Sequence, residues 1–528
     1  MKRWLSLTAA VLLLDVSLTF ENVWPTPAIR WHGRVSIELA IVVLVMALAS
    51  RWLRPPSRRI VGVIAAVWTA LVLGHYAEVT APALYGRDIN LYWDLRFIPD
   101  VVAMMTRVAR WWLIVVSAAA VVVALALLYA SARWAIRRIA DAMSARRERQ
   151  ALLVASLAAI MLFAGERITG RASLPIVFAP PVTATYAAQA RFVAQALVGS
   201  TSLPASPPMD SDLSRVKDAD VFLVFIEAYG AVSFDRPLIA DRLAASRVRL
   251  EQSIQESGRD VVSAYVTSPT FGGSSWLAHI SLMSGIEVHD PNTNAQLMTA
   301  RRDTLPRAFA RRGFRTVALM PGLRQAWPEG VFYGFDEIYG ANRLAYHGPE
   351  FGWFAIPDQF ALFRLDELEV WRSLGPPLFV FFPTISTHFP FLPTPPYQTN
   401  WSRMPDLRPY DGPSIVRAYA RQPDWMNFAP GYVEAIAYDF ATIGGYLERH
   451  TGEDFVMIVL GDHQPAAVVS GEGALWDVPV HVIANREAVL DRFRMDGFRD
   501  GITPARPTLG PMHALLPVML DAFGDRPR

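Results

Sequence analysis

The chain has 528 residues and a formal charge of +2, with 50 Lys and Arg against 48 Asp and Glu. This length exceeds what one hydrophobic core usually organises, and the balanced charge excludes a global field that would attract nucleic acid. Hydrophobic residues make up 52% of the chain and the mean hydropathy is +0.23, which is typical of proteins with membrane segments. Cysteine is absent, so disulfides, thiolate metal sites and cysteine nucleophiles are excluded.

Five apolar runs in the first third predict a transmembrane domain over residues 1–168. Each run is near the roughly 17–25 residues that a helix needs to cross a hydrocarbon core. We expect the five spanning helices at about residues 4–20, 35–53, 60–76, 111–131 and 150–165. The first run lacks a small-x-small cleavage pattern after it, so we interpret it as a retained helix rather than a signal peptide.

Basic residues predict the orientation of these helices. Lys2 and Arg3 precede the first run, arginines between 51 and 59 separate the second from the third, and a dense cluster at 133–150 separates the fourth from the fifth. If all five segments span, these clusters share one side of the membrane, and the positive-inside rule makes that side cytoplasmic. We therefore expect a multi-pass protein of the cytoplasmic (inner) membrane whose later residues are extracytoplasmic.

Two segments connect the predicted parts of the chain. Residues 90–112 mix Trp and Arg with apolar residues at helical spacing, which favours an interfacial helix near lipid headgroups over a loop with aromatic anchors. Residues 169–215 are rich in Pro, Ala and Ser, as expected of a linker with some local helix.

Residues 216–528 predict an α/β domain, because short apolar runs alternate with helix-like stretches such as 304–313 and 432–450. Continuous apolar runs of this kind suit strands that are buried on both faces of a mainly parallel sheet flanked by helices. The runs are VFLVFIE (221–227), TVALM (316–320), LFVFFPT (378–384), FVMIVLGDH (455–463) and VPVHVIA (478–484).

Three of these predicted strands end in ionisable side chains. One strand runs into Glu227, another into Asp462 and His463, and a third is followed after four residues by His388. Chemistry in open α/β sheets collects at the carboxyl ends of strands, so we expect these groups to meet at one edge. The stretch TFGGSSWLAHISLMSG (270–285) adds a glycine turn and two serines before an apolar helix.

Glu, Asp and His side chains together suit Mn²⁺, Mg²⁺ or Zn²⁺. A serine oxygen beside such an ion would lose its proton near neutral pH and become a nucleophile. Free amides at the helix start would favour a phosphoryl or sulfuryl oxygen, and His388 could contact that group or protonate the leaving oxygen. The structural alternatives are a serine that only caps the helix, worth about 1 kcal/mol, and Glu227 as a surface carboxylate.

Glu227, the G-G-S-S loop, STHFPF (386–391) and GDH (461–463) resemble motifs of the alkaline phosphatase/sulfatase superfamily. Within it, the chain is most similar to membrane-bound lipoteichoic acid synthases and phosphoethanolamine transferases. The resemblance implies five transmembrane helices before an extracytoplasmic sulfatase-like catalytic domain, here 216–528. It also implies one divalent ion held by Glu227, a serine, Asp462 and His463, with Mn²⁺ expected first and Zn²⁺ or Mg²⁺ as alternatives.

The resemblance also implies substrate contacts and a nucleophile. His388 would touch the substrate, as would Trp327, and Arg324 would contact phosphate. Aligning LMSG (282–285) with the superfamily's LxTG turn selects Ser275 as the nucleophile, whereas aligning the preceding glycine selects Ser274. We favour Ser275, because a helix of fixed rise holds its spacing more rigidly than a glycine loop does.

The leading hypothesis is a transferase that moves phosphoglycerol or phosphoethanolamine from a membrane phospholipid to a glycan or lipid-sugar acceptor through a phosphoserine. The alternatives are a membrane-anchored phosphodiesterase or phosphatase-type hydrolase and a non-catalytic membrane scaffold. The sequence disfavours a sulfatase, since neither serine is followed by the x-Pro-x-Arg needed for conversion to formylglycine, and one Glu stands where sulfatases begin with paired aspartates. The expected partners are the phospholipid donor, the acceptor and the lipid bilayer, without nucleic acid.

Overall fold

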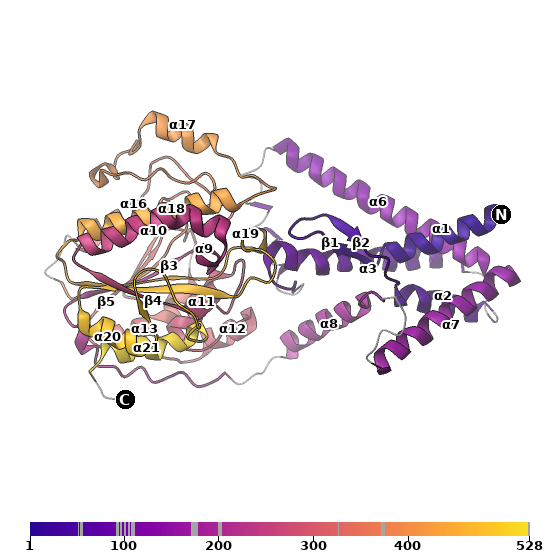
Figure 1. Cartoon of the computed structure of the whole chain (residues 1–528), viewed down its shortest axis with the longest axis horizontal. Coiled ribbons are helices and arrows are strands. Elements are labelled where there is room, and N and C mark those ends of the chain that lie inside the picture. Colours follow the sequence, from indigo (N-terminus) through magenta and orange to yellow (C-terminus); the bar gives the residue numbers. More distant parts are fainter. Residues whose placement is uncertain are drawn as a thin grey trace. The chain divides into compact units, whose positions relative to one another are not determined.

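The computed structural model describes residues 1–525 except 51, 53–55, 91–93, 96–97, 100–101, 104–105, 107–110, 170–177, 199–202, 326 and 371–374. The chain forms two compact units, Met1–Gly199 and Ser200–Arg528. Figure 1 labels the elements of both units. Most of the segment that we expect to be an interfacial helix, 90–112, lies outside the described residues.

The first unit is mainly helical. Its elements are α1 (Lys2–Val16), β1 (Phe20–Asn22), β2 (Ile29–Trp31), α2 (Ile37–Ala49), α3 (Arg58–Tyr85), α6 (Trp111–Ala142), α7 (Arg146–Thr169) and α8 (Val182–Val198). Helices thus form in all five of the segments that we expect to span a membrane. Among the described residues, three helices, α3, α6 and α7, have the length and apolar composition to cross a membrane.

The first two helices are shorter than the sequence predicts, for local reasons. The helix expected over 4–20 ends at Val16, because Ser17 begins a turn and Phe20–Asn22 pairs with Ile29–Trp31 in an antiparallel hairpin. The helix expected over 35–53 begins only after Ser36, whose side chain caps it by accepting the N–H of Leu39.

The second unit contains one eight-stranded sheet among its described residues. In spatial order the strands are β10 (Arg499–Asp500), β4 (Asp260–Thr267), β9 (Asp477–Ala484), β8 (Phe455–Gly461), β3 (Asp220–Ile226), β7 (Leu378–Pro383), β5 (Arg315–Met320) and β6 (Glu337–Gly340). The five strands from β8 to β6 are mutually parallel, whereas β9 is antiparallel to both β8 and β4.

The sheet is therefore mixed, and the expectation of a mainly parallel sheet holds only for its β8-to-β6 half. Strand β9 was expected to resemble the parallel strands. It runs the other way because the connection from β8, residues 462–476, contains only the four-residue helix α19 (Ala467–Ser470). A parallel return usually contains a full helix that crosses the sheet, and this connection has none.

Helices cover both faces of the sheet. One face is covered by α10 (Pro237–Glu256), α16 (Asp358–Leu368) and α18 (Ala429–Arg449), and the other by α11 (Ser275–Ser284), α13 (Leu305–Ala310), α20 (Glu487–Met495) and α21 (Leu515–Phe523) (Figure 1). Alternate side chains of β3 enter the two layers: Phe225 packs with the α11 layer, and Val224 with the α18 layer. Each such buried side chain contributes roughly 1.5–3 kcal/mol.

Shorter elements complete the second unit. They are α9 (Val232–Asp235), α12 (Pro291–Thr299), α14 (Pro328–Tyr333), α15 (Ala341–Leu344), α17 (Gly412–Ala420) and the single turns η2 (Ser214–Val216), η4 (Trp401–Arg403) and η5 (Met512–Ala514).

The three strands that end in candidate functional residues are neighbours, in the order β8-β3-β7. Their registers align Ile226 with Gly461 and Phe225 with Pro383. Glu227, Asp462 and Thr384 therefore each come directly after a strand end at nearly the same level of the sheet. The single shared edge that the sequence predicts is present.

Candidate functional site

Four side chains from three elements meet at this edge. The ligand atoms of Glu227, Asp462 and His463, here called the ligand cluster, all lie within 4.8 Å of one another. Ser275, the first residue of α11, donates its hydroxyl hydrogen to Glu227 Oε2 at 2.7 Å. The same Oγ lies 3.2 Å from His463 Nε2. The residues that sequence reasoning grouped around a metal are thus brought together.

Backbone hydrogen bonds hold the two acids of the ligand cluster. Asp462 Oδ1 accepts the N–H groups of Ala228 at 2.8 Å and His463 at 2.6 Å. Ala228 has a φ of 58°, a left-handed conformation that a non-glycine residue adopts only when its surroundings fix it. The N–H of Glu227 donates to Thr384 Oγ1 at 3.2 Å. Each strand end is therefore tied to its neighbour.

The imidazole of His463 is oriented by a second contact. Its Nδ1 lies 2.8 Å from the carbonyl oxygen of Gln464. Because a carbonyl oxygen only accepts, Nδ1 carries a proton there, and Nε2 is directed to Glu227 at 3.3 Å and to Ser275. Metal-binding histidines are commonly oriented by such a carbonyl contact on the other ring nitrogen.

The two carboxyl groups of the ligand cluster have opposite electrostatic environments. Burial and the negative charge of Glu227 raise the pKa of Asp462 well above its usual range. Burial also opposes ionisation of Glu227, but its hydrogen bond to His463 and the charge of that residue lower its pKa below the ordinary value. Burial lowers the pKa of His463, yet Asp462 and Glu227 outweigh this and raise it to about 9.

These opposite shifts mean that, without a cation, the single imidazole balances the charge of only one carboxylate, so that Asp462 favours its protonated form. Asp462 and His463 are 1% and 2% exposed, so water contributes little. A cation among the two carboxylates would favour their ionised forms together. Two carboxylate donors, one imidazole nitrogen and one hydroxyl form a donor set that fits a divalent ion such as Mn²⁺, Zn²⁺ or Mg²⁺.

The two adjacent serines have different environments. Ser274 has a left-handed φ of 63° and precedes α11, but its side chain makes no capping hydrogen bond. Ser275 is the residue whose hydroxyl contacts Glu227 and His463. The turn before them depends on Gly272 and Gly273, with φ of 66° and 142°, which favour glycine. Ser275, the serine that the spacing to LMSG (282–285) favours, is thus the one that contacts the ligand cluster.

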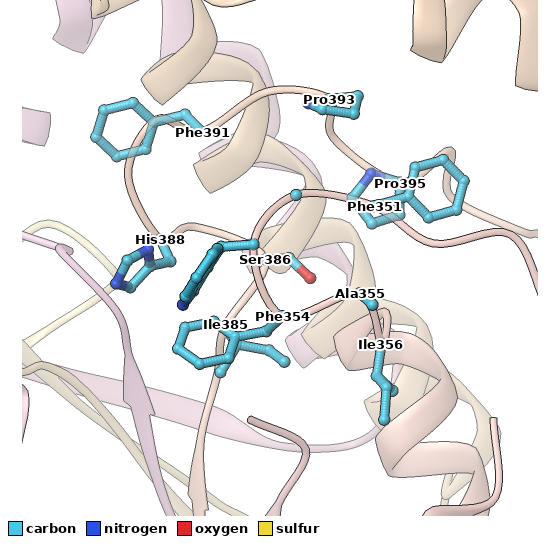
Figure 2. Close-up of a pocket in the computed structure, with 12 residues that line it drawn as sticks. Phe351, Phe354, Ala355, Ile356, Ile385, Ser386, His388, Phe391, Pro393 and Pro395 are labelled. Carbon is cyan, nitrogen blue, oxygen red and sulfur yellow. The ribbon is translucent and has the colours of Figure 1, made fainter. Parts of the chain in front are cut away.

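His388 follows β7 and lines a separate small pocket, shown in Figure 2. Its Nδ1 lies 2.7 Å from the carbonyl of Phe389, and its ring packs edge-on against Phe354 at 5.0 Å between centroids. A positive charge on His388 lowers the pKa of Glu227, so the pocket is within electrostatic range of the ligand cluster. The pocket is lined by Phe351, Gly352, Trp353, Phe354, Ala355, Ile356, Ile385, Ser386, His388, Phe391, Pro393 and Pro395.

Arg324 and Trp327 are not brought to the ligand cluster. Arg324 donates to the carbonyl of Phe354 at 3.1 Å, so it is attached to the His388 pocket. Trp327 stacks on Phe335 at 6.3 Å, within the core layer on the α11 side. Within the described part of the chain, neither residue has a hydrogen bond or ring contact with the ligand cluster or with Ser275.

Sequence reasoning missed two residues that shape this region. Phe354 links Arg324 to His388, and the aromatic run FGWF (351–354) was the signal available for it. Gln464 braces the loop after β8, because its side chain accepts from Val232 N–H at 3.2 Å and donates to the Leu475 carbonyl at 2.9 Å. Its position directly after the Asp-His pair could have indicated this role.

No protein-family model and no curated protein matches the chain. Among solved structures it is similar to the integral membrane protein lipooligosaccharide phosphoethanolamine transferase A (EptA) from Neisseria meningitidis, with 13% identity and a TM-score of 0.40 over 90% of this chain and 88% of that one. It is also similar to the lipoteichoic acid synthase LtaP from Listeria monocytogenes, with 13% identity and a TM-score of 0.41 over 62% and 76% of the two chains.

A third similar structure is the C-terminal periplasmic domain of EcEptC from Escherichia coli in complex with Zn. The identity is 13% and the TM-score 0.39, over 60% of this chain and 84% of that one. Two of these names, lipoteichoic acid synthase and phosphoethanolamine transferase, are those of the proteins whose motifs the sequence resembles.

Proposed function

We propose that the chain is a metal-dependent transferase that moves a phospho-headgroup, phosphoglycerol or phosphoethanolamine, from a membrane phospholipid to an extracytoplasmic glycan or lipid-sugar acceptor. A covalent phosphoserine at Ser275 is the intermediate. One observation carries the proposal: the Ser275 hydroxyl, at the start of an apolar helix, lies 2.7 Å from Glu227 and 3.2 Å from His463. A serine that served only as a cap would not be directed at buried metal-ligating groups.

Glu227, Asp462, His463 and Ser275 would hold one divalent ion, with Mn²⁺ our first expectation and Zn²⁺ or Mg²⁺ the alternatives. When bound, such an ion supplies Lewis-acid chemistry, which favours loss of the serine proton and offsets negative charge on a phosphoryl group. The support for the ion is the donor set itself, whose ligand atoms lie within 4.8 Å of one another.

The residues of the chain supply the rest of the reaction. Ser275 Oγ attacks phosphorus and forms a new P–O bond, while the P–O bond to diacylglycerol breaks. The serine loses its proton in this step, and the diacylglycerol oxygen gains one. An acceptor hydroxyl then attacks the phosphorus of the phosphoserine and loses its proton as a new O–P bond forms. The bond between Ser275 Oγ and phosphorus breaks, and Oγ regains a hydrogen. Backbone N–H groups at the start of α11 stabilise the phosphoryl oxygens in both steps.

His388 protonates the leaving oxygen or contacts the phosphoryl group in this proposal. Its Nδ1 is already used at Phe389, so Nε2 is the atom available for substrate. Arg324 would reach substrate phosphate from the same pocket, to which it is attached through Phe354. Trp327 remains the proposed substrate contact with the least support, since its ring packs on Phe335.

The proposal includes an arrangement in the membrane. Residues 1–168 would form five spans, α1, α2, α3, α6 and α7, followed by a linker over 169–215 and an extracytoplasmic catalytic domain over 216–528. The basic clusters at the ends of these helices support it. A topology reporter fused after Arg528 should give an extracytoplasmic signal in the inner membrane, and a cytoplasmic signal would contradict the orientation.

Headgroup-labelled phospholipid tests the activity itself. We expect metal-loaded full-length protein in bilayer nanodiscs to release diacylglycerol and to retain the labelled headgroup covalently when no acceptor is present. The Ser275→Ala variant should do neither. Labelled free headgroup phosphate in place of labelled protein and acceptor would indicate the hydrolase, and absence of diacylglycerol from wild-type protein would indicate the scaffold.

A further inference from the structure

A second pair of buried acids lies next to the loop between β7 and His388. Asp358, the first residue of α16, is 0% exposed, and Asp439, in the middle of α18, is 1% exposed. Their helices meet at these positions, because the N–H of Gln359 donates to the hydroxyl of Tyr438 at 3.3 Å. Neither aspartate belongs to the ligand cluster or to the pocket of His388.

Asp358 binds the backbone of the loop between β7 and His388. Its carboxylate accepts the N–H of Ile385 at 2.9 Å and the N–H of Ser386 at 2.7 Å. In return, the Ser386 hydroxyl accepts the N–H of Asp358 at 3.3 Å. Figure 2 shows Ile385, Ser386 and His388 along this loop. Hydrogen bonds to an ionised carboxylate are stronger than neutral ones, so this residue is a firm anchor.

Asp439 has no comparable donors. Among the described residues, neither of its carboxyl oxygens accepts a hydrogen bond, and no basic side chain forms an ion pair with it. Burial and the negative charge of Asp358 raise its pKa well above the usual range, and the hydroxyls of Thr384 and Thr387 lower it only in part. A buried carboxyl group without a cation keeps its proton.

We propose that Asp439 is a protonated acid that donates to the Asp358 carboxylate, and that this pair positions the loop of residues 384–388 and thereby His388. Both aspartates are positioning residues, because they act through the loop and touch no substrate. The inference rests on the proposed function for the role of His388. Burial raises the pKa of Asp358 to about 6, against the opposing hydrogen bonds from Ser386 and Ile385 and a smaller one that involves Asp439.

Exchanging each acid for its amide distinguishes the two roles. Asp358→Asn removes one acceptor from the two loop N–H groups, and we expect kcat/KM for headgroup transfer to fall by about 100-fold, as for a misplaced catalytic group. Asp439→Asn keeps a hydrogen-bond donor toward Asp358, so its kcat/KM should fall far less. An equal loss in both variants, or a larger loss in Asp439→Asn, would overturn the assignment of donor and acceptor.

A double-mutant cycle tests whether Asp358 acts through His388. The effects of Asp358→Asn and His388→Gln on kcat/KM should be strongly non-additive, since the first change acts by displacing the second residue. Asp366→Asn is the matched control, because Asp366 is also fully buried on α16 and bonds to α18, at Tyr446 and His450. It should lower thermal stability and combine additively with His388→Gln. Additive behaviour of Asp358→Asn would refute the proposal.

Infrared difference spectroscopy locates the proton without relying on activity. Metal-loaded wild-type protein should show a buried carboxylic acid band that disappears in Asp439→Asn and persists in Asp366→Asn. Absence of this band from wild-type protein would overturn the acid–carboxylate pair. If wild-type protein transfers no headgroup but shows the band, the proposed function fails while the shared proton stands.

Discussion

Two pairs of buried acids lie near the carboxyl end of the same sheet, and they differ in what surrounds them. Glu227 and Asp462 share their space with the imidazole of His463 and a serine hydroxyl. Asp358 and Asp439 have backbone N–H groups on one side and no imidazole. In both pairs, one carboxyl has a markedly higher pKa than the other.

The difference shows that burial of two acids does not by itself indicate a metal site. In the first pair, the carboxylates lie beside an imidazole nitrogen and a serine hydroxyl, so the four groups could hold a cation. In the second pair, loop N–H groups occupy the carboxylate that is ionised, and a shared proton satisfies the remaining acid. The same residue type thus supplies candidate metal ligands at one place and anchors a loop at the other.

Removing the hydroxyl of the proposed nucleophile should abolish activity at the site of Glu227 and Asp462. We expect Ser275→Ala to reduce turnover and protein labelling by at least about 10³-fold, since the attacking oxygen is lost. Ser274→Ala is the matched control, because its side chain makes no hydrogen bond at the cap and should leave labelling intact. Both are measured as labelled headgroup on the protein. Loss of labelling only in Ser274→Ala would show that the neighbouring serine is the nucleophile.

Asp462→Asn should convert the first pair into one that cannot hold an ion. We expect metal affinity to fall by more than the roughly 100-fold that loss of an outer partner costs, with activity falling in parallel. Metal content of purified protein by mass spectrometry, beside turnover, gives the answer. Asp358→Asn should keep its metal, and full activity in an Asp462→Asn protein free of metal would exclude the mechanism.

The pH dependence of metal binding should also distinguish the first pair, which lies beside His463, from the second. In the metal-free chain His463 has a pKa of about 9 against an ordinary 6.5, so its ionic stabilisation is complete below about 6.5 and is lost as pH rises through about 9. An ion requires the neutral ring, so binding should release a proton and tighten across this window. Titration calorimetry in buffers of different ionisation enthalpy measures the number of protons released per bound ion. A value of zero would contradict the expectation.

Thr384 touches both pairs and should give the smallest effect. Its hydroxyl accepts the N–H of Glu227 and acts on Asp439. Thr384→Val keeps the shape but removes the hydroxyl, and we expect a loss of about 1 kcal/mol in the free energy of unfolding. Chemical denaturation of wild-type and variant protein measures it. A loss of bound metal, rather than of stability, would mean that Thr384 belongs to the first site.

Much of the first site could be predicted from the sequence, because its residues follow apolar strands directly. Because Glu227 and the Asp462–His463 pair directly follow apolar strands, the sequence shows that these residues lie at carboxyl strand ends. Parallel neighbouring strands then bring those ends to one edge of the sheet. The second pair was not predicted. Asp358 and Asp439 lie within helical sequence, and nothing local shows that α16 and α18 bring them to the same loop.

Other differences from the prediction have similar causes. The direction of β9 depends on how the connection from β8 folds, which its apolar composition does not encode. The end of α1 at Val16 depends on the hairpin that follows, a pairing between segments with little apolar pattern. Apolar periodicity identifies an element, while its end and its partner depend on tertiary contacts.

Gly461 is the last residue of β8, directly before Asp462, and a Cβ at this position would overlap the carbonyl oxygen of Tyr229. The distance between the backbones of Glu227 and Asp462 is therefore limited by the close contact of Gly461 with the main chain of Tyr229. An engineer who wished to change the preferred ion could shorten Glu227 to aspartate without the strands closing in to compensate. Selectivity in this scaffold should be adjustable through side-chain length alone, provided that the glycine is kept.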